Sequence, residues 1–112
     1  MIPKNVHVFL KGQAKKSYLA LQRRHDKEAQ SLLRSIDRLQ ARLRENPQYG
    51  QPVPRRLYPK SLAALGIQNL YRAELAQYWC ALYTIEGDEV GIYLFILTIA
   101  DHKTYDRMFG YA

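Results

Sequence analysis

A nearly apolar run of ten residues, Gly91–Ala100, restricts the possible folds of this chain more than any other feature. Large apolar side chains occupy both faces of the strand that we expect over residues 89–98, so this strand should lie at the centre of a sheet and be covered on both sides. The run has half of the ~20 residues that a membrane-spanning helix needs. Residues 1–10 lack the apolar stretch of a secretory signal. We therefore expect a cytoplasmic protein with no membrane association.

The N-terminal half of the chain is predicted to form one strand and a helical hairpin. Alternation of apolar and polar side chains predicts a strand over residues 5–10. Apolar residues at helical spacing predict helices over residues 13–24 and 27–45, and the second helix has a continuous apolar stripe. Asp26 is the expected N-cap of this second helix, because its carboxylate can accept hydrogen bonds from free backbone N–H groups.

The C-terminal half is predicted to be mainly β-structure. Residues 46–59 contain four prolines and should form an irregular connector within the domain. Side chains typical of β-structure predict three further strands, over residues 69–75, 78–86 and 89–98. A tight turn is expected at Gly87–Asp88. The predicted fold is α+β: a single domain over residues 1–112, with the N-terminal strand and helical hairpin packed on a four-stranded, mainly antiparallel sheet.

Charge is divided unevenly between the two halves. The chain has a formal net charge of +7, which consists of +10 in residues 1–60 and −3 in residues 61–112. A basic half that folds beside a mildly acidic half indicates a surface that faces a polyanion such as nucleic acid. Lys and Arg side chains that merely solvate two helices would give the same pattern, so charge alone leaves both interpretations open.

The sequence lacks the motifs of most enzymes and metal proteins. His7, His25 and His102 do not have metal-ligand spacing, and no glycine-rich phosphate loop, dinucleotide fingerprint or nucleophile elbow is present. Cys80 is the only cysteine, which excludes an internal disulfide and a cysteine-based zinc cluster. Its position among large apolar residues predicts an inert buried thiol. We expect neither a metal nor another cofactor.

The remaining candidates for a functional site are polar residues of the C-terminal half. By the two-residue period of a strand, Leu70, Arg72 and Glu74 share one face. Polar residues that follow a buried strand are well placed to line a cleft, although they can also cap the strand and pack the tail. Four such residues come directly after the central strand: Asp101, His102, Lys103 and Tyr105.

Three segments of this half have a distinctive order and spacing. They are Asn69-Leu70-Tyr71-Arg72, Tyr78-Trp79-Cys80-Ala81-Leu82-Tyr83-Thr84-Ile85 and Asp101-His102-Lys103-Thr104-Tyr105, the last of which continues to Tyr111. Together they resemble the RelE/ParE family of bacterial and archaeal toxins. The predicted order of elements is also that of the compact RelE-like fold, so the resemblance covers essentially the whole chain. It implies the toxin of a type II toxin–antitoxin system, with a cognate antitoxin protein as partner.

The resemblance also implies a chemistry, the metal-independent cleavage of messenger RNA, often on the ribosome. The ribose 2′-hydroxyl is deprotonated and attacks the adjacent phosphate, a general acid protonates the departing 5′ oxygen, and positive charge stabilises the transition state. Arg72 matches the residue that would hold the scissile phosphate. The other expected catalytic residues are His102, Lys103 and Tyr105. The residues expected to bind backbone phosphates are Arg55, Arg56, Lys60 and Arg107.

Two positions depart from the family pattern. Cys80 stands where the family usually has an arginine, and a thiol cannot supply the planar, charged fork that holds a phosphate. Glu74 stands where a second arginine is often found, and its carboxylate would repel phosphate. Either Arg107 or Lys103 takes over, or the nuclease activity is weak or lost. The alternatives are therefore a ParE-like inhibitor of DNA gyrase without nuclease activity, and an attenuated toxin-fold protein that binds nucleic acid or a partner.

Overall fold

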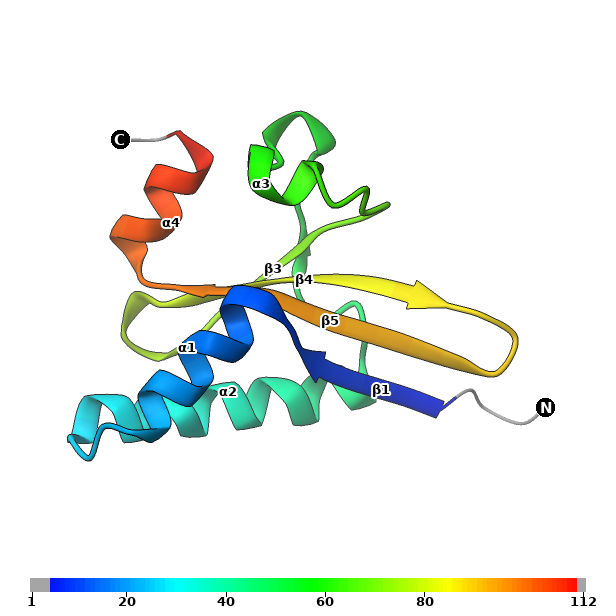
Figure 1. Ribbon diagram of the computed structural model, residues 1–112. Coiled ribbons are helices and arrows are strands. Elements are labelled where there is room, and N and C mark those ends of the chain that lie inside the picture. The colour runs from blue at the N-terminus through cyan, green and yellow to red at the C-terminus, as the bar shows by residue number, and fades with distance from the viewer. Residues whose placement is uncertain (1–4, 111–112) are drawn as a thin grey trace.

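A computed structural model describes residues 5–110 of the protein; Tyr111, the last residue of the tail motif, lies outside them. The fold is α+β, with helices on both faces of a five-stranded sheet of order β1-β5-β4-β3-β2 (Figure 1). In chain order, the elements are β1 (Asn5–Leu10), α1 (Gly12–Gln22), α2 (Lys27–Glu45), β2 (Gln51–Pro52), the 3₁₀ helix η1 (Arg55–Leu57), α3 (Lys60–Ala63), β3 (Tyr71–Glu74), the 3₁₀ helix η2 (Ala76–Tyr78), β4 (Cys80–Gly87), β5 (Gly91–Ala100) and α4 (His102–Phe109). Within the described range, no helix is both long enough and apolar enough to cross a membrane.

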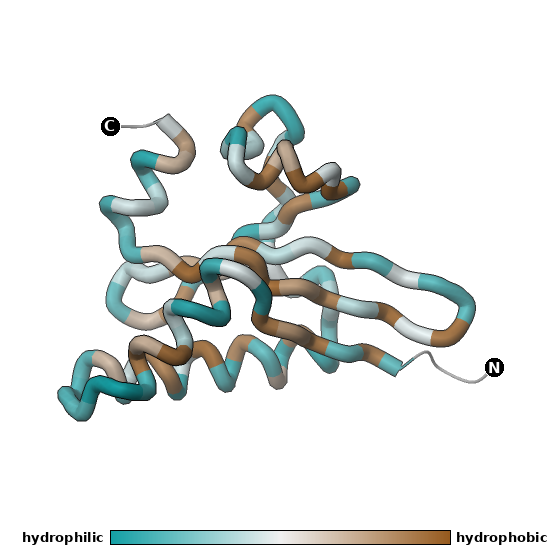
Figure 2. Tube along the Cα trace, viewed as in Figure 1, coloured by the Kyte–Doolittle hydropathy of each residue, from teal (hydrophilic) through white to brown (hydrophobic). Residues whose placement is uncertain are grey.

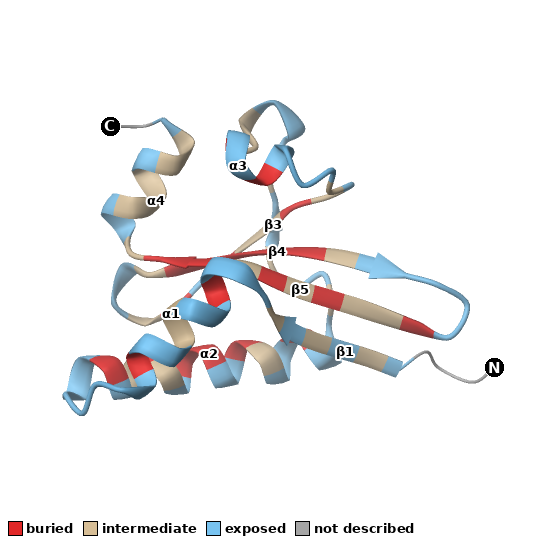
Figure 3. Ribbon diagram, viewed as in Figure 1, coloured by how far each residue is buried: buried red, intermediate tan, exposed pale blue. Residues whose placement is uncertain are grey.

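The predicted helical hairpin is confirmed. α2 begins and ends at the predicted residues, and its buried apolar stripe faces the sheet (Figure 3). The Asp26 side chain accepts a hydrogen bond from the Ala29 N–H (3.2 Å), as an N-cap does. Hydrogen bonds from the Arg24 side chain and from the Ala29 N–H lower the pKa of the Asp26 carboxyl to about 2. The first helix, α1, differs from its prediction only at its ends.

The strand predicted over residues 89–98 forms as β5, two residues further along the chain, and it lies inside the sheet, next to the middle strand β4. It pairs in parallel with β1 and antiparallel with β4. Other side chains cover both faces of β5 along only part of the strand. One face packs against α1 and α2, and on the other face Leu97 contacts the cluster under α4. Towards the start of β5, Tyr93 and Phe95 instead stack on His7 and Phe9 of β1, with ring centroids 5.5 and 5.6 Å apart. Because Phe9 is 44% exposed, this end of the second face is not covered.

The prediction of four strands was wrong, because the connector contributes a fifth. β2 pairs antiparallel with β3 at the edge of the sheet, where a proline is tolerated because an edge strand can leave one side of its backbone unpaired. The buried Tyr83 hydroxyl fixes the preceding loop: it accepts from the Gly50 N–H (2.8 Å) and donates to the Pro47 carbonyl (3.1 Å). A Cβ atom at Gly50 would lie 2.7 Å from the Arg72 carbonyl oxygen, so glycine allows this close approach.

Apolar residues form two clusters, one on each face of the sheet (Figure 2). The larger lies between the sheet and α1 and α2, and the smaller contains Leu62, Leu70 and Leu82 with apolar side chains of α4. The tail, for which no secondary structure was predicted, forms α4. Asp101 caps it by accepting a hydrogen bond from the Thr104 N–H (2.8 Å), and Gly110 ends it with a left-handed φ of 75°. The tail residues of the predicted site therefore project from a helix.

Candidate functional site

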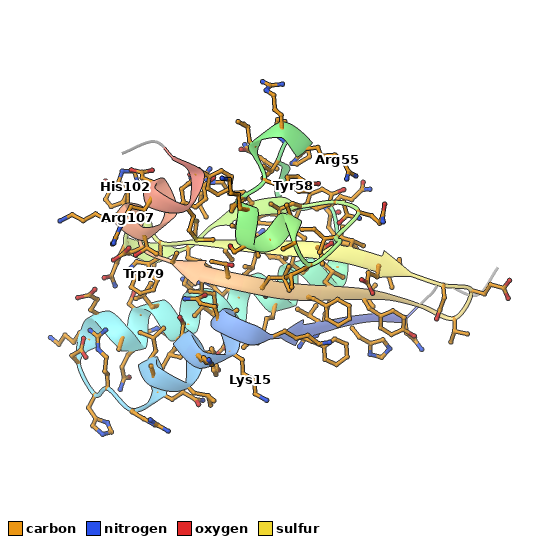
Figure 4. The ribbon with its side chains drawn as sticks, turned by 45° about the horizontal axis from the view of Figure 1, so that its top comes forward. Lys15, Arg55, Tyr58, Trp79, His102 and Arg107 are labelled. Carbon is orange, nitrogen blue, oxygen red and sulfur yellow. The ribbon has the colours of Figure 1, made fainter. Side chains whose placement is uncertain are left out.

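A pocket of about 340 Å³ lies where the first turn of α4 approaches the loop between β3 and β4. It contains two of the four predicted catalytic residues, which come from motifs far apart in the sequence. Figure 4 shows His102 on α4 and Trp79 at the start of β4 at the same end of the sheet. The residues that line the pocket are Arg72, Glu74, Leu75, Gln77, Tyr78, Trp79 and His102.

Arg72 is held by contacts on two sides. Its guanidinium carbon lies 5.1 Å from the centroid of the Tyr105 ring, a cation–π contact that brings a third predicted catalytic residue to the site. On the other side, Nη2 donates to Glu74 Oε1 (3.3 Å), which confirms that the two residues share a face of β3. The Nε atom is buried and has no hydrogen-bond partner among the described residues. The Arg72 side chain is thus fixed in place, and its guanidinium also lies beside the Cys80 thiol.

His102 is oriented by a carboxylate one helical turn further along α4. Its Nε2 lies 3.1 Å from Asp106 Oδ2, and the imidazole is 71% exposed at the mouth of the pocket. When Nε2–H donates to Asp106, the Nδ1 atom of the neutral ring carries a lone pair and can accept a proton. Lys103 is exposed on the same helix and does not line the pocket, so the structure separates it from Arg72.

Cys80 lies beneath this site and is 4% exposed, so the predicted buried thiol is confirmed. It is paired with Glu74 across the β3–β4 ladder. Burial raises the pKa of the Cys80 thiol to about 11, an effect that the nearby Arg72 guanidinium only partly opposes. An arginine at position 80 would place a buried cation beside the Arg72 guanidinium, which proteins tolerate poorly.

Cys80 should accordingly resist alkylation in the folded protein. The thiolate is the reactive form, and a thiol with a pKa of about 11 is almost entirely protonated at pH 8. We expect iodoacetamide to modify Cys80 rapidly only after denaturant is added, as mass spectrometry would show. Modification of the native protein at the rate of a free cysteine would contradict the buried position.

A second pocket, of about 460 Å³, lies between the η1–α3 segment and α4. Three of the four predicted phosphate-binding residues line it: Arg56, Lys60 and Arg107. Arg55 is not among them, because its Nη2 donates to the Gln68 carbonyl (3.0 Å) and its guanidinium lies over the Tyr58 ring (5.7 Å). Figure 4 shows Arg55 and Tyr58 on the η1 side, across from Arg107 on α4.

One stacked pair of rings connects the two pockets. Tyr105, which contacts Arg72 of the first pocket, stacks on Phe109 with ring centroids 4.4 Å apart. Phe109 in turn lines the second pocket. The two pockets therefore flank one helix, α4, and together present cations from three separate parts of the chain.

Sequence reasoning missed several residues around the first pocket. Tyr78 was expected to begin a strand, but it lies in η2 with a φ of 62° and is 88% exposed. Three arginines of α2 also border the same loop and strand: Arg34 lines a hollow with Gln77, and Arg38 and Arg42 line another with Glu74. Their spacing of four residues along α2 was the available signal, because it places all three on one side of the helix.

Comparison of the chain with protein-family models, with curated proteins and with solved structures gives no match. Within residues 5–110, no group of three or more His, Cys, Asp and Glu side chains is arranged to hold a metal ion. What the protein does therefore has to be inferred from the side chains that the two pockets bring together.

Proposed function

We propose that this protein is the toxin of a type II toxin–antitoxin system and that it cleaves messenger RNA without a metal ion. The main support is the first pocket: Arg72 and His102, taken from two of the three motifs that resemble the RelE/ParE family, line it together. Tyr105, from the same motif as His102, lies against Arg72, with the guanidinium carbon 5.1 Å from its ring centroid. A cation and a proton acceptor at one place are two of the groups that 2′-hydroxyl attack on a phosphate uses, and the Tyr105 ring holds the cation.

Each residue has a defined role in this proposal. Arg72 binds the scissile phosphate and stabilises the charge that develops on its oxygens. His102 takes the proton of the 2′-hydroxyl at Nδ1 while Asp106 holds the ring by Nε2. The O2′–P bond forms as the P–O5′ bond breaks, and a water molecule gives a proton to the departing oxygen, because Lys103 does not line the pocket. The product ends are a 2′,3′-cyclic phosphate and a 5′-hydroxyl.

The second pocket attracts the rest of the RNA strand electrostatically. Arg56, Lys60 and Arg107 line it, and their charges suit the phosphates on one side of the cleavage site. Contacts of this kind depend strongly on salt and carry no sequence information. A cognate antitoxin would have to cover at least one of the two pockets to block the activity.

A second candidate function is the binding of RNA without cleavage. It is favoured by the contact between Arg72 and Glu74 (3.3 Å), which occupies one arm of the guanidinium and brings a negative charge to the pocket. The buried Cys80 also leaves the site with one cation fewer than the family pattern has. In this case the protein would retain the fold and the phosphate contacts but catalyse slowly or not at all.

Expression without an antitoxin tests the proposal. We expect growth arrest together with cuts in messenger RNA, and we expect His102→Ala to relieve both effects. His25→Ala is the matched control, because His25 is an exposed histidine in the α1–α2 turn. Arrest with intact transcripts, an SOS response and inhibited supercoiling would instead identify a gyrase inhibitor. Intact transcripts combined with a His102→Ala variant as toxic as the parent would refute cleavage.

Glu74→Gln is expected to raise both RNA affinity and cleavage. The change releases Arg72 from its ion pair and removes a carboxylate from the pocket. An exposed pair of this kind is worth up to about 1 kcal/mol, which corresponds to an increase of up to about fivefold. Cleavage rates under single-turnover conditions measure the effect, with Glu86→Gln, an exposed acid outside the pocket, as the control. A decrease in rate would show that Glu74 assists the reaction.

A further inference from the structure

The loop between β3 and β4 has an unusual backbone. Gln77 and Tyr78 are consecutive and both left-handed, with φ angles of 59° and 62°. Residues with a side chain rarely adopt this conformation, and glycine or asparagine would adopt it at lower cost. A strained segment beside a pocket commonly has a functional reason.

The strain is maintained by contacts with α2. The Ala76 N–H donates to Ser35 Oγ (2.8 Å), and Gln77 Nε2 donates to the Glu28 carbonyl (3.3 Å). The loop is closed by a hydrogen bond from the Leu75 N–H to the Trp79 carbonyl (2.8 Å). The loop therefore holds its shape up to the backbone of the next residue, Tyr78.

The Tyr78 ring has no stabilising role that the structure shows. It is 88% exposed, and within residues 5–110 its side chain makes no hydrogen bond and no ring contact. It nevertheless lines the pocket that contains Arg72 and His102. An exposed aromatic ring beside a phosphate-binding cation is the arrangement by which proteins stack the unpaired bases of single-stranded nucleic acid.

We propose that Tyr78 stacks on one base of a single-stranded RNA whose phosphate is bound by Arg72. The inference rests on the proposed function and deepens it, because it gives a binding role to a motif residue to which the resemblance assigned none. Stacking uses the π-face that every base has, so it positions the strand without selecting a sequence. A paired base lies within its helix and cannot reach the ring, so Tyr78 favours single-stranded over double-stranded RNA.

Trp79 makes the test specific to this pocket. It is the only tryptophan of the chain and it lines the same pocket, so its fluorescence reports binding there. One probe is a short single-stranded RNA, 2′-O-methylated to prevent cleavage. The others form a series in which the same strand has a single abasic nucleotide, placed at a different position in each probe. Tyr78→Asn removes the ring while asparagine tolerates the left-handed backbone, and Tyr78→Phe keeps the ring. Val90→Ala is the control, since Val90 is 72% exposed in the distant β4–β5 turn.

We expect Tyr78→Asn to weaken binding of the full RNA by about 5-fold to 100-fold, and Tyr78→Phe and Val90→Ala to change it little. With the abasic nucleotide at the stacked position, wild type and Tyr78→Asn should bind equally. Equal binding of the full RNA by both proteins would overturn the stacking inference. If wild type and Tyr78→Asn bind RNA equally but Arg72→Gln binds it more weakly, only the stacking inference fails and the proposed function survives. If the wild-type protein does not bind RNA, the stacking inference and the proposed function both fail.

Discussion

Replacing Arg72 with glutamine is expected to lower the rate of RNA cleavage by about 10²–10³-fold, the usual loss when one group that stabilises transition-state charge is removed. Arg72 is the one cation that lines the first pocket apart from a protonated His102, so no described neighbour in the lining can replace it. Its guanidinium lies against the Tyr105 ring, so the charge is already positioned before substrate binds. Pre-positioned charge of this kind contributes most to catalysis.

The measurement is the single-turnover rate constant at saturating protein, because it separates chemistry from binding. Arg72→Lys should recover only part of the rate, since lysine retains the charge but lacks the planar fork. Arg23→Gln, an exposed arginine at the end of α1, is the matched control for the loss of one positive charge. A loss below threefold for Arg72→Gln would mean that the phosphate is held elsewhere.

Replacing Tyr83 with alanine is expected to lower the free energy of unfolding by about 3–5 kcal/mol. The side chain is completely buried in the larger core cluster and stacks on Tyr71 with ring centroids 5.3 Å apart. Its hydroxyl also holds the Gly50 N–H and the Pro47 carbonyl. Alanine would therefore remove a large core side chain and release the loop that leads to β2.

Denaturant unfolding, followed by circular dichroism, measures this loss. Tyr83→Phe isolates the contribution of the hydroxyl and should cost about 1–3 kcal/mol, because two buried backbone groups lose their partner. This variant should also increase hydrogen exchange at Gly50 while leaving α2 protected. A cost below 1 kcal/mol for Tyr83→Ala would show that the connector and the core are not coupled through this residue.

The elements that the sequence predicted well are those with strong local signals. α2 follows from its apolar stripe and its N-cap Asp26, and both are properties of neighbouring residues. Large apolar side chains on both faces of β5 predict that this strand lies inside the sheet and not at its edge. α4 had usable signals as well, since Asp101 and Gly110 occupy the positions that a helix N-cap and C-terminal glycine prefer.

The elements that were missed depend on contacts between distant residues. β2 pairs with β3, and the loop before β2 is fixed by Tyr83 of β4. No pattern among neighbouring residues predicts this pairing. Tyr78 looks like the start of a strand because aromatic residues favour strands. Its left-handed backbone instead belongs to a loop that contacts α2 through the hydrogen bond from Ala76 to Ser35, a contact between distant residues.

The candidate site was predicted in part, for the same reason. Arg72, His102 and Tyr105 come together because β3 and the end of β5 place their motifs at one end of the sheet. The sequence could not separate Arg55 from its neighbour Arg56, because only the fold shows that Arg55 bonds to Gln68 while Arg56 lines the second pocket. Lys103 adjoins His102 in the sequence, but the helix turns it away from the pocket lining.

Metal-free cleavage of RNA through the 2′-hydroxyl leaves chemically distinctive ends, and these ends can be identified. Purified protein is incubated with single-stranded RNA in the presence of EDTA, and the new ends are identified by mass spectrometry. We predict 2′,3′-cyclic phosphate and 5′-hydroxyl ends, and no cut at a position whose 2′-hydroxyl is methylated. RNA that stays intact, or that is cut equally well when methylated, would contradict the proposed mechanism.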